Sequence, residues 1–256
     1  MIDVHAHINS HNFPPAGDTK TLDLIISAAK NAGVQHVVSV SESIHDAPDI
    51  IQVARNSNGF IWPAVGLHPV QPLSKEDKRE RSVTIQDLEL FEPFLNEAIS
   101  TKEIYCVGEV GLDFSPHIIS KNQNNSSEFS EEQLKDIQRE VFRRQVLMAM
   151  QADLPVNGVV REESGRSRVL VQIVEEVACL HCMNRYYFSV PPSIVRSPQK
   201  QTLVKNIDLT HLLLETDSPA LGPERGVDNE PANILIAAEE IARIKKVTVE
   251  EVVCTI

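Results

Sequence analysis

Short apolar segments typical of strands alternate with amphipathic segments typical of helices along this chain of 256 residues. Strand-like patterns cover residues 2–5, 35–41, 61–68, 104–112, 154–160, 178–182, 186–190 and 211–215. Helical spacing covers residues 19–32, 46–56, 83–99, 130–152, 168–177, 197–205 and 231–245. This alternation predicts an α/β fold with parallel strands and right-handed crossovers. Eight such strands favour one (β/α)8 barrel of TIM type over residues 1–256, with a doubly wound open sheet as the alternative.

Polar residues stand at the ends of several of these strands. His5 and His7 close the first strand, and residues i and i+2 of a strand point to the same side. Glu109 lies in an otherwise apolar strand, and Asp217 follows the last strand. Two imidazoles and two carboxylates form a mixed nitrogen and oxygen site for a divalent metal. Their positions also favour the barrel, because barrel active sites lie at the carboxyl ends of the strands.

Each carboxylate has a structural alternative. A buried Glu109 needs a partner, which is either a metal or a basic side chain in an ion pair. Asp217 precedes a Ser-Pro pair, so it is either a ligand, the base for a metal-activated water, or a turn cap. His68 either ends its strand or contacts a substrate phosphate. Asp113 either contacts substrate or supports a ligand from behind.

The composition narrows the function further. A formal net charge of −12 argues against coating nucleic acid by charge alone. No apolar run reaches about 18 residues and no signal peptide pattern opens the chain, so we expect no membrane contact. Four scattered cysteines indicate a reducing, intracellular compartment, either cytoplasm or nucleus. The pair Cys179 and Cys182 lacks the second CxxC of a zinc ribbon. No feature indicates an obligate protein partner.

Two stretches depart from a regular barrel. Only four residues separate His181 from Tyr186, whereas a parallel crossover needs about a dozen. From residue 247 the sequence reads as the start of a helix, with Thr248 as its cap. We therefore expect an irregular barrel near the sixth and seventh strands and at the C-terminal end, with His181 displaced or loosely held.

Four motifs together resemble those of the TatD family of metal-dependent deoxyribonucleases, within the amidohydrolase-like barrels. They are residues 3–7 (DVHAH), 66–69 (GLHP), 108–113 (GEVGLD) and 215–219 (ETDSP). The segments 190–197, 220–224 and 229–231 resemble a narrower group, the third of the animal TatD-domain-containing deoxyribonucleases. The resemblance extends from residue 2 to about residue 252.

The resemblance implies specific roles for the site residues. The metal ligands it implies are His5, His7, Glu109, His181 and Asp217. They would hold one or two divalent ions, with Mg²⁺, Mn²⁺ and Zn²⁺ not distinguished. Asp217 would orient or deprotonate the attacking water, and Glu109 would bridge two ions. His68 and Arg161 would hold phosphate oxygens, and DNA is the implied substrate.

One family feature is missing. After the fifth strand the family has a His-x-Arg motif whose histidine binds metal. Here Arg161 matches the arginine, but Val159 stands where the histidine is expected. The chain therefore resembles an altered or truncated form. We expect a metal-dependent deoxyribonuclease that hydrolyses phosphodiester bonds with a metal-activated water. The alternatives are an inactive or binding-only relative, and an amidohydrolase acting on a small molecule.

Overall fold

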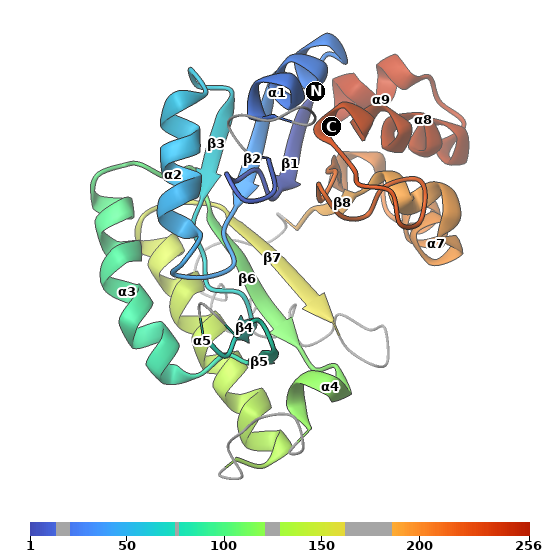
Figure 1. Ribbon diagram of the computed structural model, residues 1–256. Helices are drawn as coiled ribbons and strands as arrows, with labels where there is room; N and C mark the ends of the chain where they lie inside the picture. The colour runs from blue at the N-terminus through green and yellow to red at the C-terminus, as the bar shows by residue number, and fades with distance from the viewer. Residues whose placement is uncertain (14–20, 75–76, 121–128, 162–185) are drawn as a thin grey trace. The chain divides into compact units, whose positions relative to one another are not determined.

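A computed structural model describes residues 1–13, 21–74, 77–120, 129–161 and 186–256 (Figure 1). The chain divides into two compact units. The first unit comprises Met1–Ser39, Gln52–Trp62 and Asn184–Ile256, and the second comprises Val40–Ile51 and Pro63–Met183. The assignment of residues 1–256 to a single domain stays a prediction.

The first unit contains two groups of short strands. Strand β1 (Ile2–Ala6) pairs in parallel with β2 (His36–Val40), and the sheet order is β1-β2-β3. Strand β3 (Ile61–Ala64) runs from the first unit into the second. Strands β8 (Phe188–Val190) and β9 (Leu212–Leu214) form a separate parallel pair. The predicted alternation of strand and helix is thus present on both sides of the undescribed residues 162–185.

Helices surround these strands. They are α1 (Leu22–Asn31), α7 (Pro198–Asn206), α8 (Ile234–Lys245) and α9 (Val249–Thr255), with 3-10 turns at Pro192–Arg196, Leu209–His211 and Pro231–Asn233. Figure 1 shows α8 between α7 and α9, and α8 contacts both. The Thr248 hydroxyl accepts a hydrogen bond from Glu251 N, so the predicted helix cap is confirmed.

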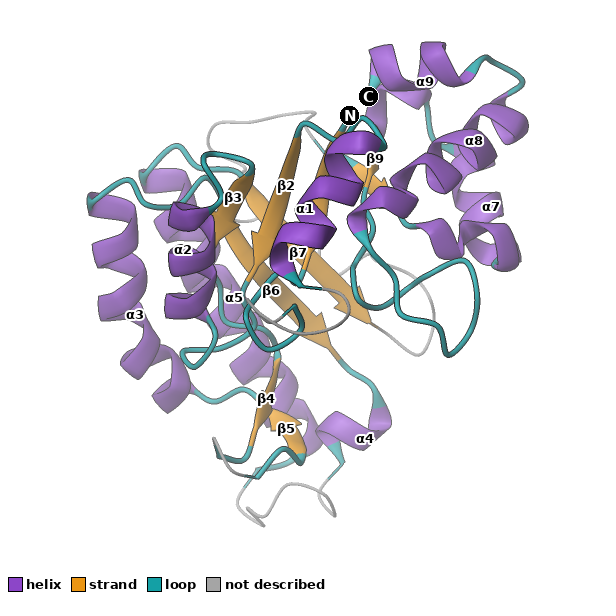
Figure 2. Cartoon of the chain, turned by 45° about the horizontal axis from the view of Figure 1, so that its top comes forward, coloured by secondary structure: helices purple, strands orange, loops and turns teal. Residues whose placement is uncertain are grey.

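The second unit is built on one long parallel pair. Strand β6 (Val107–Asp113) is buried along its whole length and pairs with β7 (Val156–Arg161). Helix α5 (Glu131–Gln151) packs on β6 and against α3 (Ile85–Ser100), as Figure 2 shows. Helix α2 (Ala47–Asn56) spans the boundary between the units. A capping box begins α5, in which the Ser130 hydroxyl accepts from Gln133 N and the Gln133 side chain accepts from Ser130 N.

Two features of the second unit differ from the predictions. The strand expected over residues 61–68 ends at Ala64, because two of the next three amides bond to side chains: Gly66 N to Ser41 Oγ and Leu67 N to Gln145 Oε1. The sequence analysis also missed an antiparallel hairpin, β4 (Val70–Pro72) with β5 (Glu80–Ser82), and the short helix α4 (Pro116–Ile119).

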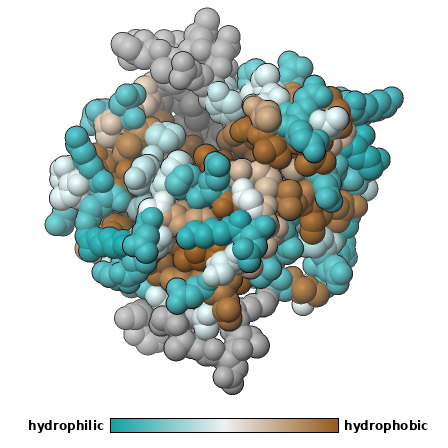
Figure 3. All heavy atoms as spheres, turned by 90° about the horizontal axis from the view of Figure 1, so that it is seen from above, coloured by the Kyte–Doolittle hydropathy of each residue, from teal (hydrophilic) through white to brown (hydrophobic). Residues whose placement is uncertain are grey.

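Each unit has its own apolar core. One core gathers around Phe13, Ile194 and Ile241, and the other around Phe91, Leu112 and Phe142. Figure 3 shows hydrophobic surface interspersed with hydrophilic side chains on the face drawn. Among the described residues, no helix has the length and apolarity that a membrane span requires. The predicted strand 178–182, the predicted helix 168–177 and the shortened connection after His181 lie outside the described residues.

Candidate metal centre

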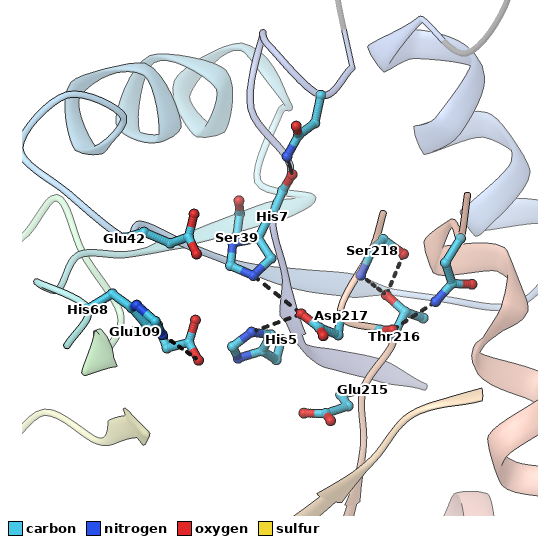
Figure 4. Close-up of polar contacts among 12 residues, drawn as sticks. His5, His7, Ser39, Glu42, His68, Glu109, Glu215, Thr216, Asp217 and Ser218 are labelled. Atoms are coloured by element: carbon cyan, nitrogen blue, oxygen red, sulfur yellow. Dashed lines mark hydrogen bonds and ion pairs between the residues drawn. The ribbon is translucent and has the colours of Figure 1, made fainter. Parts of the chain in front are cut away.

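Three potential ligands meet at the carboxyl end of β1 in the first unit. The Nε2 atoms of His5 and His7 lie 3.4 Å and 3.3 Å from the same Oδ1 atom of Asp217 (Figure 4). The two rings stand edge to face, with centroids 5.2 Å apart. Ligands bound to an ion at about 2.1 Å in a tetrahedron lie about 3.4 Å from one another. Each imidazole nitrogen therefore has the spacing from the carboxylate oxygen expected of ligands around one divalent ion.

The backbone fixes the two ligand segments to each other. Asp217 N donates to His5 O at 2.8 Å, and His7 N donates to Ser218 O at 2.8 Å. Asp217 has a φ of 57°, in the left-handed region that costs a non-glycine residue about 1–2 kcal/mol. Such strained residues persist where surrounding contacts hold them, and they concentrate at functional sites. The strain at Asp217 is therefore a second indication that its orientation serves a function.

The local electrostatics favour an ionised Asp217. Burial alone would raise the pKa of this carboxyl, but hydrogen bonds from His5 and His7 outweigh burial and hold the pKa well below its usual range. Glu215 responds in the opposite direction. Burial raises its pKa, although His5 and a hydrogen bond from Ser189 oppose the shift. Ionised Asp217 is thus the group suited to bind a cation.

A buried polar network lies behind this cluster. Asp3 is fully buried, and its Oδ1 accepts from Thr216 N (2.9 Å) and His5 N (3.3 Å). Its Oδ2 accepts from the Thr216 hydroxyl at 2.5 Å. Thr216 Oγ1 in turn accepts from the Ser218 hydroxyl, and Asn229 Nδ2 donates to Thr216 O. Burial raises the pKa of Asp3 to about 7. The network thus connects the residues flanking Asp217 to the strand that carries His5.

Glu109 and His68 form a buried pair in the second unit. Glu109 is 4% exposed and lies within β6, and its amide donates to Ser41 O at 2.8 Å. His68 is also 4% exposed, and its Nε2 lies 4.0 Å from Glu109 Oε1. The pair brings an imidazole and a carboxylate together among buried residues.

Asp113 and Arg161 meet at the ends of β6 and β7. Their positions pair across the two strands, and Arg161 Nη1 lies 3.5 Å from Asp113 Oδ2. Asp113 is buried, whereas the Arg161 side chain is largely exposed. The backbone of Asp113 is fixed by Gln138, which bonds to both its N and its O. The exposed guanidinium of Arg161 is therefore held by a residue whose own backbone is fixed.

The predicted site residues thus fall into three described groups. His5, His7 and Asp217 come together in the first unit. In the second unit, His68 lies near Glu109, and Asp113 lies near Arg161. The expectation that Glu109 shares one metal site with the first group stays a prediction, since Glu109 belongs to the other unit. His181 lies outside the described residues.

The sequence analysis missed two sets of residues. The first set is the buried network around Asp3, which appeared in the sequence only as part of the motif that contains the two histidines. Its partners Thr216, Ser218 and Asn229 were not predicted. The signal for Asp3 was a charged residue inside an apolar strand, the same signal that identified Glu109. It also missed Glu42, which follows the second strand as Asp217 follows the last.

The fold and these ligand groups define an α/β protein with a candidate metal centre. The family model described as TatD related DNase matches residues 2–256, and the chain belongs to this family. The human Deoxyribonuclease TATDN3 is 40% identical over 266 residues, which cover 99% of this chain and 90% of the human protein. The predicted family membership, including the narrower group, is therefore confirmed.

Two further comparisons agree. YabD of Bacillus subtilis, an uncharacterized metal-dependent hydrolase, is 29% identical, with 98% of this chain and 94% of YabD covered. The crystal structure of a TatD family hydrolase from Entamoeba histolytica matches with a TM-score of 0.72 at 18% identity, covering 99% of this chain and 94% of that one. This likeness confirms the predicted fold class, a TIM-type α/β barrel.

Proposed function

We propose that this protein is a metal-dependent nuclease that hydrolyses phosphodiester bonds in DNA. The observation that carries the proposal is the approach of both His5 Nε2 and His7 Nε2 to one oxygen of Asp217. Membership of the TatD related DNase family and the activity named for the human relative support DNA as the substrate. The free thiols of Cys106 and Cys254 are compatible with the reducing cytoplasm or nucleus that we propose as its location.

We propose that His5, His7, Asp217 and Glu109 would hold one or two divalent ions. The donor set fits, because neutral imidazole and carboxylate suit Zn²⁺ and Mn²⁺ and carboxylate suits Mg²⁺. His181 is proposed as a further ligand on the family resemblance alone. A bound divalent ion supplies Lewis acidity, which polarises the scissile phosphate and favours ionisation of the attacking water.

The roles of handling the attacking water and of contacting the phosphate belong to side chains of the protein. We assign Asp217 to orienting or deprotonating the attacking water. Arg161 presents a guanidinium to the phosphate oxygens, and the contact with Asp113 limits its rotation. Asp113 is therefore a positioning residue for Arg161.

A labelled oligonucleotide tests the proposal. We expect the purified full chain to release shorter products with Mg²⁺, Mn²⁺ or Zn²⁺ and to lose this activity with a chelator. Asp217→Asn keeps the size of the side chain but removes the charge, and it should abolish cleavage. Undiminished cleavage in chelator, or by Asp217→Asn, would show that this centre does not catalyse the reaction.

Two controls separate the alternatives. A panel of small amides and lactones, assayed with the same metals, tests the amidohydrolase alternative. Metal binding without hydrolysis of either substrate class would identify a binding-only relative. The loss of the histidine at position 159 makes this second control necessary.

A further inference from the structure

The second unit contains another group of potential metal ligands, formed by Glu42, His68 and Glu109. One ligand atom from each residue lies within 4.8 Å of the other two. His68 and Glu109 are buried, and Glu42 is exposed. Figure 4 shows the three side chains turned toward one another. The group thus combines two buried ligands with a third that is accessible from solvent.

Backbone hydrogen bonds hold the three ligand-bearing segments together. His68 N donates to Glu42 O at 2.9 Å, and Glu109 N donates to Ser41 O at 2.8 Å. Gln71 Nε2 donates both to Glu42 O (2.7 Å) and to His68 O (2.8 Å). Main-chain contacts therefore fix the backbones of the three ligand residues relative to one another. Such preorganisation favours ligand binding, because little additional ordering is needed.

The charges of the group select a cation. Two carboxylates near one imidazole repel a phosphate anion. The sequence had predicted a phosphate as the partner of His68. The same two carboxylates balance the charge of a divalent ion. Three protein ligands with a remaining position for water are the usual arrangement at catalytic metal sites.

His68 can supply the lone pair that coordination requires. Its Nδ1 lies 3.2 Å from Val70 O and 3.1 Å from Val70 N, so Nδ1 donates to that carbonyl in one tautomer and accepts from that amide in the other. In the tautomer protonated at Nδ1, Nε2, the atom nearer Glu109, carries the lone pair, and a metal ion bound at Nε2 would select this tautomer. A metal-binding histidine commonly donates its other ring N–H to a carbonyl in this way.

We propose that Glu42, His68 and Glu109 bind a divalent metal ion of the Mn²⁺ or Zn²⁺ type, as a ligand set of the second unit that differs from His5, His7 and Asp217 in its members. The inference rests on the proposed function in one respect, because Glu109 belongs to both ligand sets. It adds Glu42 as a ligand and changes the role of His68 from phosphate contact to metal ligand. It also provides a second metal position that does not need a histidine at position 159.

A titration with Mn²⁺, followed by the electron paramagnetic resonance signal of the free ion, tests the proposal on the full chain. The informative variant is Glu42→Gln, which keeps the side-chain size and the backbone contacts. Glu89→Gln is the matched control, because Glu89 is an exposed carboxylate on α3 of the same unit. Asp217→Asn removes a ligand of the other site. Thermal melts in chelator confirm that all variants fold.

We expect Glu42→Gln to lose one bound equivalent of Mn²⁺, or to bind it at least about tenfold more weakly. Mutating a residue that only hydrogen-bonds to a metal ligand already lowers metal affinity by about 10–100-fold. Glu89→Gln should match the unmodified protein, and Asp217→Asn should retain the equivalent that Glu42→Gln loses. Identical isotherms for Glu42→Gln and the unmodified protein would overturn the inference and leave only an ion pair at His68. If Glu42→Gln loses bound Mn²⁺ while Asp217→Asn changes neither Mn²⁺ binding nor DNA cleavage, the inference is supported and the proposed function is contradicted.

Nuclear magnetic resonance supplies an independent readout. In the Asp217→Asn protein, substoichiometric Mn²⁺ should broaden the ring-proton signals of His68, assigned by their absence in His68→Gln. Inorganic phosphate without metal should leave these signals unchanged. If the His68 signals shift with phosphate and are not broadened by Mn²⁺, His68 contacts phosphate and the inference is wrong.

Discussion

Asp3 accepts two hydrogen bonds from Thr216, one from the backbone amide at 2.9 Å and one from the hydroxyl at 2.5 Å. The two residues are far apart in the sequence, and both are fully buried. Thr216 immediately precedes the strained Asp217, and Asp3 lies in the strand that carries His5. The pair therefore positions one proposed metal ligand relative to another.

Removing the Thr216 hydroxyl should disturb both stability and metal binding. Thr216→Val leaves Asp3 Oδ2 and the Ser218 hydroxyl without this partner, and an unsatisfied buried polar group costs about 1–3 kcal/mol. We expect a lower melting temperature and weaker metal binding, with kcat falling more than KM rises. Thr216→Ser keeps the hydroxyl and should restore metal affinity. An unchanged metal affinity in Thr216→Val would limit the pair to a purely structural role.

Local sequence patterns identified some residues of this candidate centre and not others. His5 and His7 are two residues apart in one strand, so strand geometry alone places their rings on one side. Asp217 and Glu109 could be identified because each is a charge beside apolar strand residues. Thr216 carried no such signal, because its importance arises from a hydrogen bond to a residue at the other end of the sequence.

Glu42 shows the same limit more clearly. It lies in a polar stretch after β2, so its sequence neighbours do not distinguish it from a loop residue. Its approach to His68 follows from the bond between His68 N and Glu42 O, which joins two successive strand ends. The β4–β5 hairpin was missed for a related reason. Its strands are three residues each, and charged residues occupy β5.

The stability of the second unit should depend on pH through Asp87, the capping residue of α3. Its carboxylate accepts from Arg81 Nη1 (2.6 Å) and Nη2 (2.8 Å), and from Thr84 N (2.8 Å). Burial alone would raise the pKa of Asp87, but the bonds from Arg81 and Thr84 outweigh burial and lower the pKa below 3.8. Ionised Asp87 therefore stabilises the folded state above about pH 4, and this contribution is lost as the pH falls through the folded-state pKa.

Asp87→Asn should lower the free energy of unfolding by about 1–2 kcal/mol at neutral pH, because the neutral amide weakens the hydrogen bonds from Arg81 and Thr84. The difference from the unmodified protein should shrink as the pH falls through the folded-state pKa, below which Asp87 is neutral in both states. Urea denaturation at several pH values measures it, with Glu89→Gln as the control on the same helix. A difference that is constant across this range would mean that the charge of Asp87 does not stabilise the fold.

Restoring a histidine at position 159 should strengthen metal binding. Val159 pairs with Gly111, and Arg161 pairs with Asp113, in the regular part of the β6–β7 register. Alternate residues share one face of a strand, so position 159 points to the same side as Arg161. We expect Val159→His to bind metal more tightly and to cleave DNA faster. Val160→His places an imidazole on the opposite face and should have neither effect. Equal gains from both variants would contradict the register.

Gly66 should be required for the position of Glu109. A Cβ atom at Gly66 would lie 2.6 Å from Gly108 C and 2.8 Å from Glu109 O, both of them backbone atoms. Because the backbone of β6 is buried and paired, Gly66→Ala must displace it, and overpacking of this kind costs about 1–3 kcal/mol. We expect a lower melting temperature and weaker binding of every ion that uses Glu109.

Gly222→Ala provides the comparison for this last variant. Its nearest neighbours, the Asn229 side chain and Val227 O, lie 3.3 Å from the added Cβ. A shift of a few tenths of an ångström accommodates such a contact, so the melting temperature should change little. Metal affinity that falls in Gly66→Ala while remaining unchanged in Gly222→Ala would show that the close approach of Gly66 to β6 positions Glu109. Equal metal affinities in the two variants would mean that a displacement of β6 does not change the position of Glu109 enough to affect metal binding.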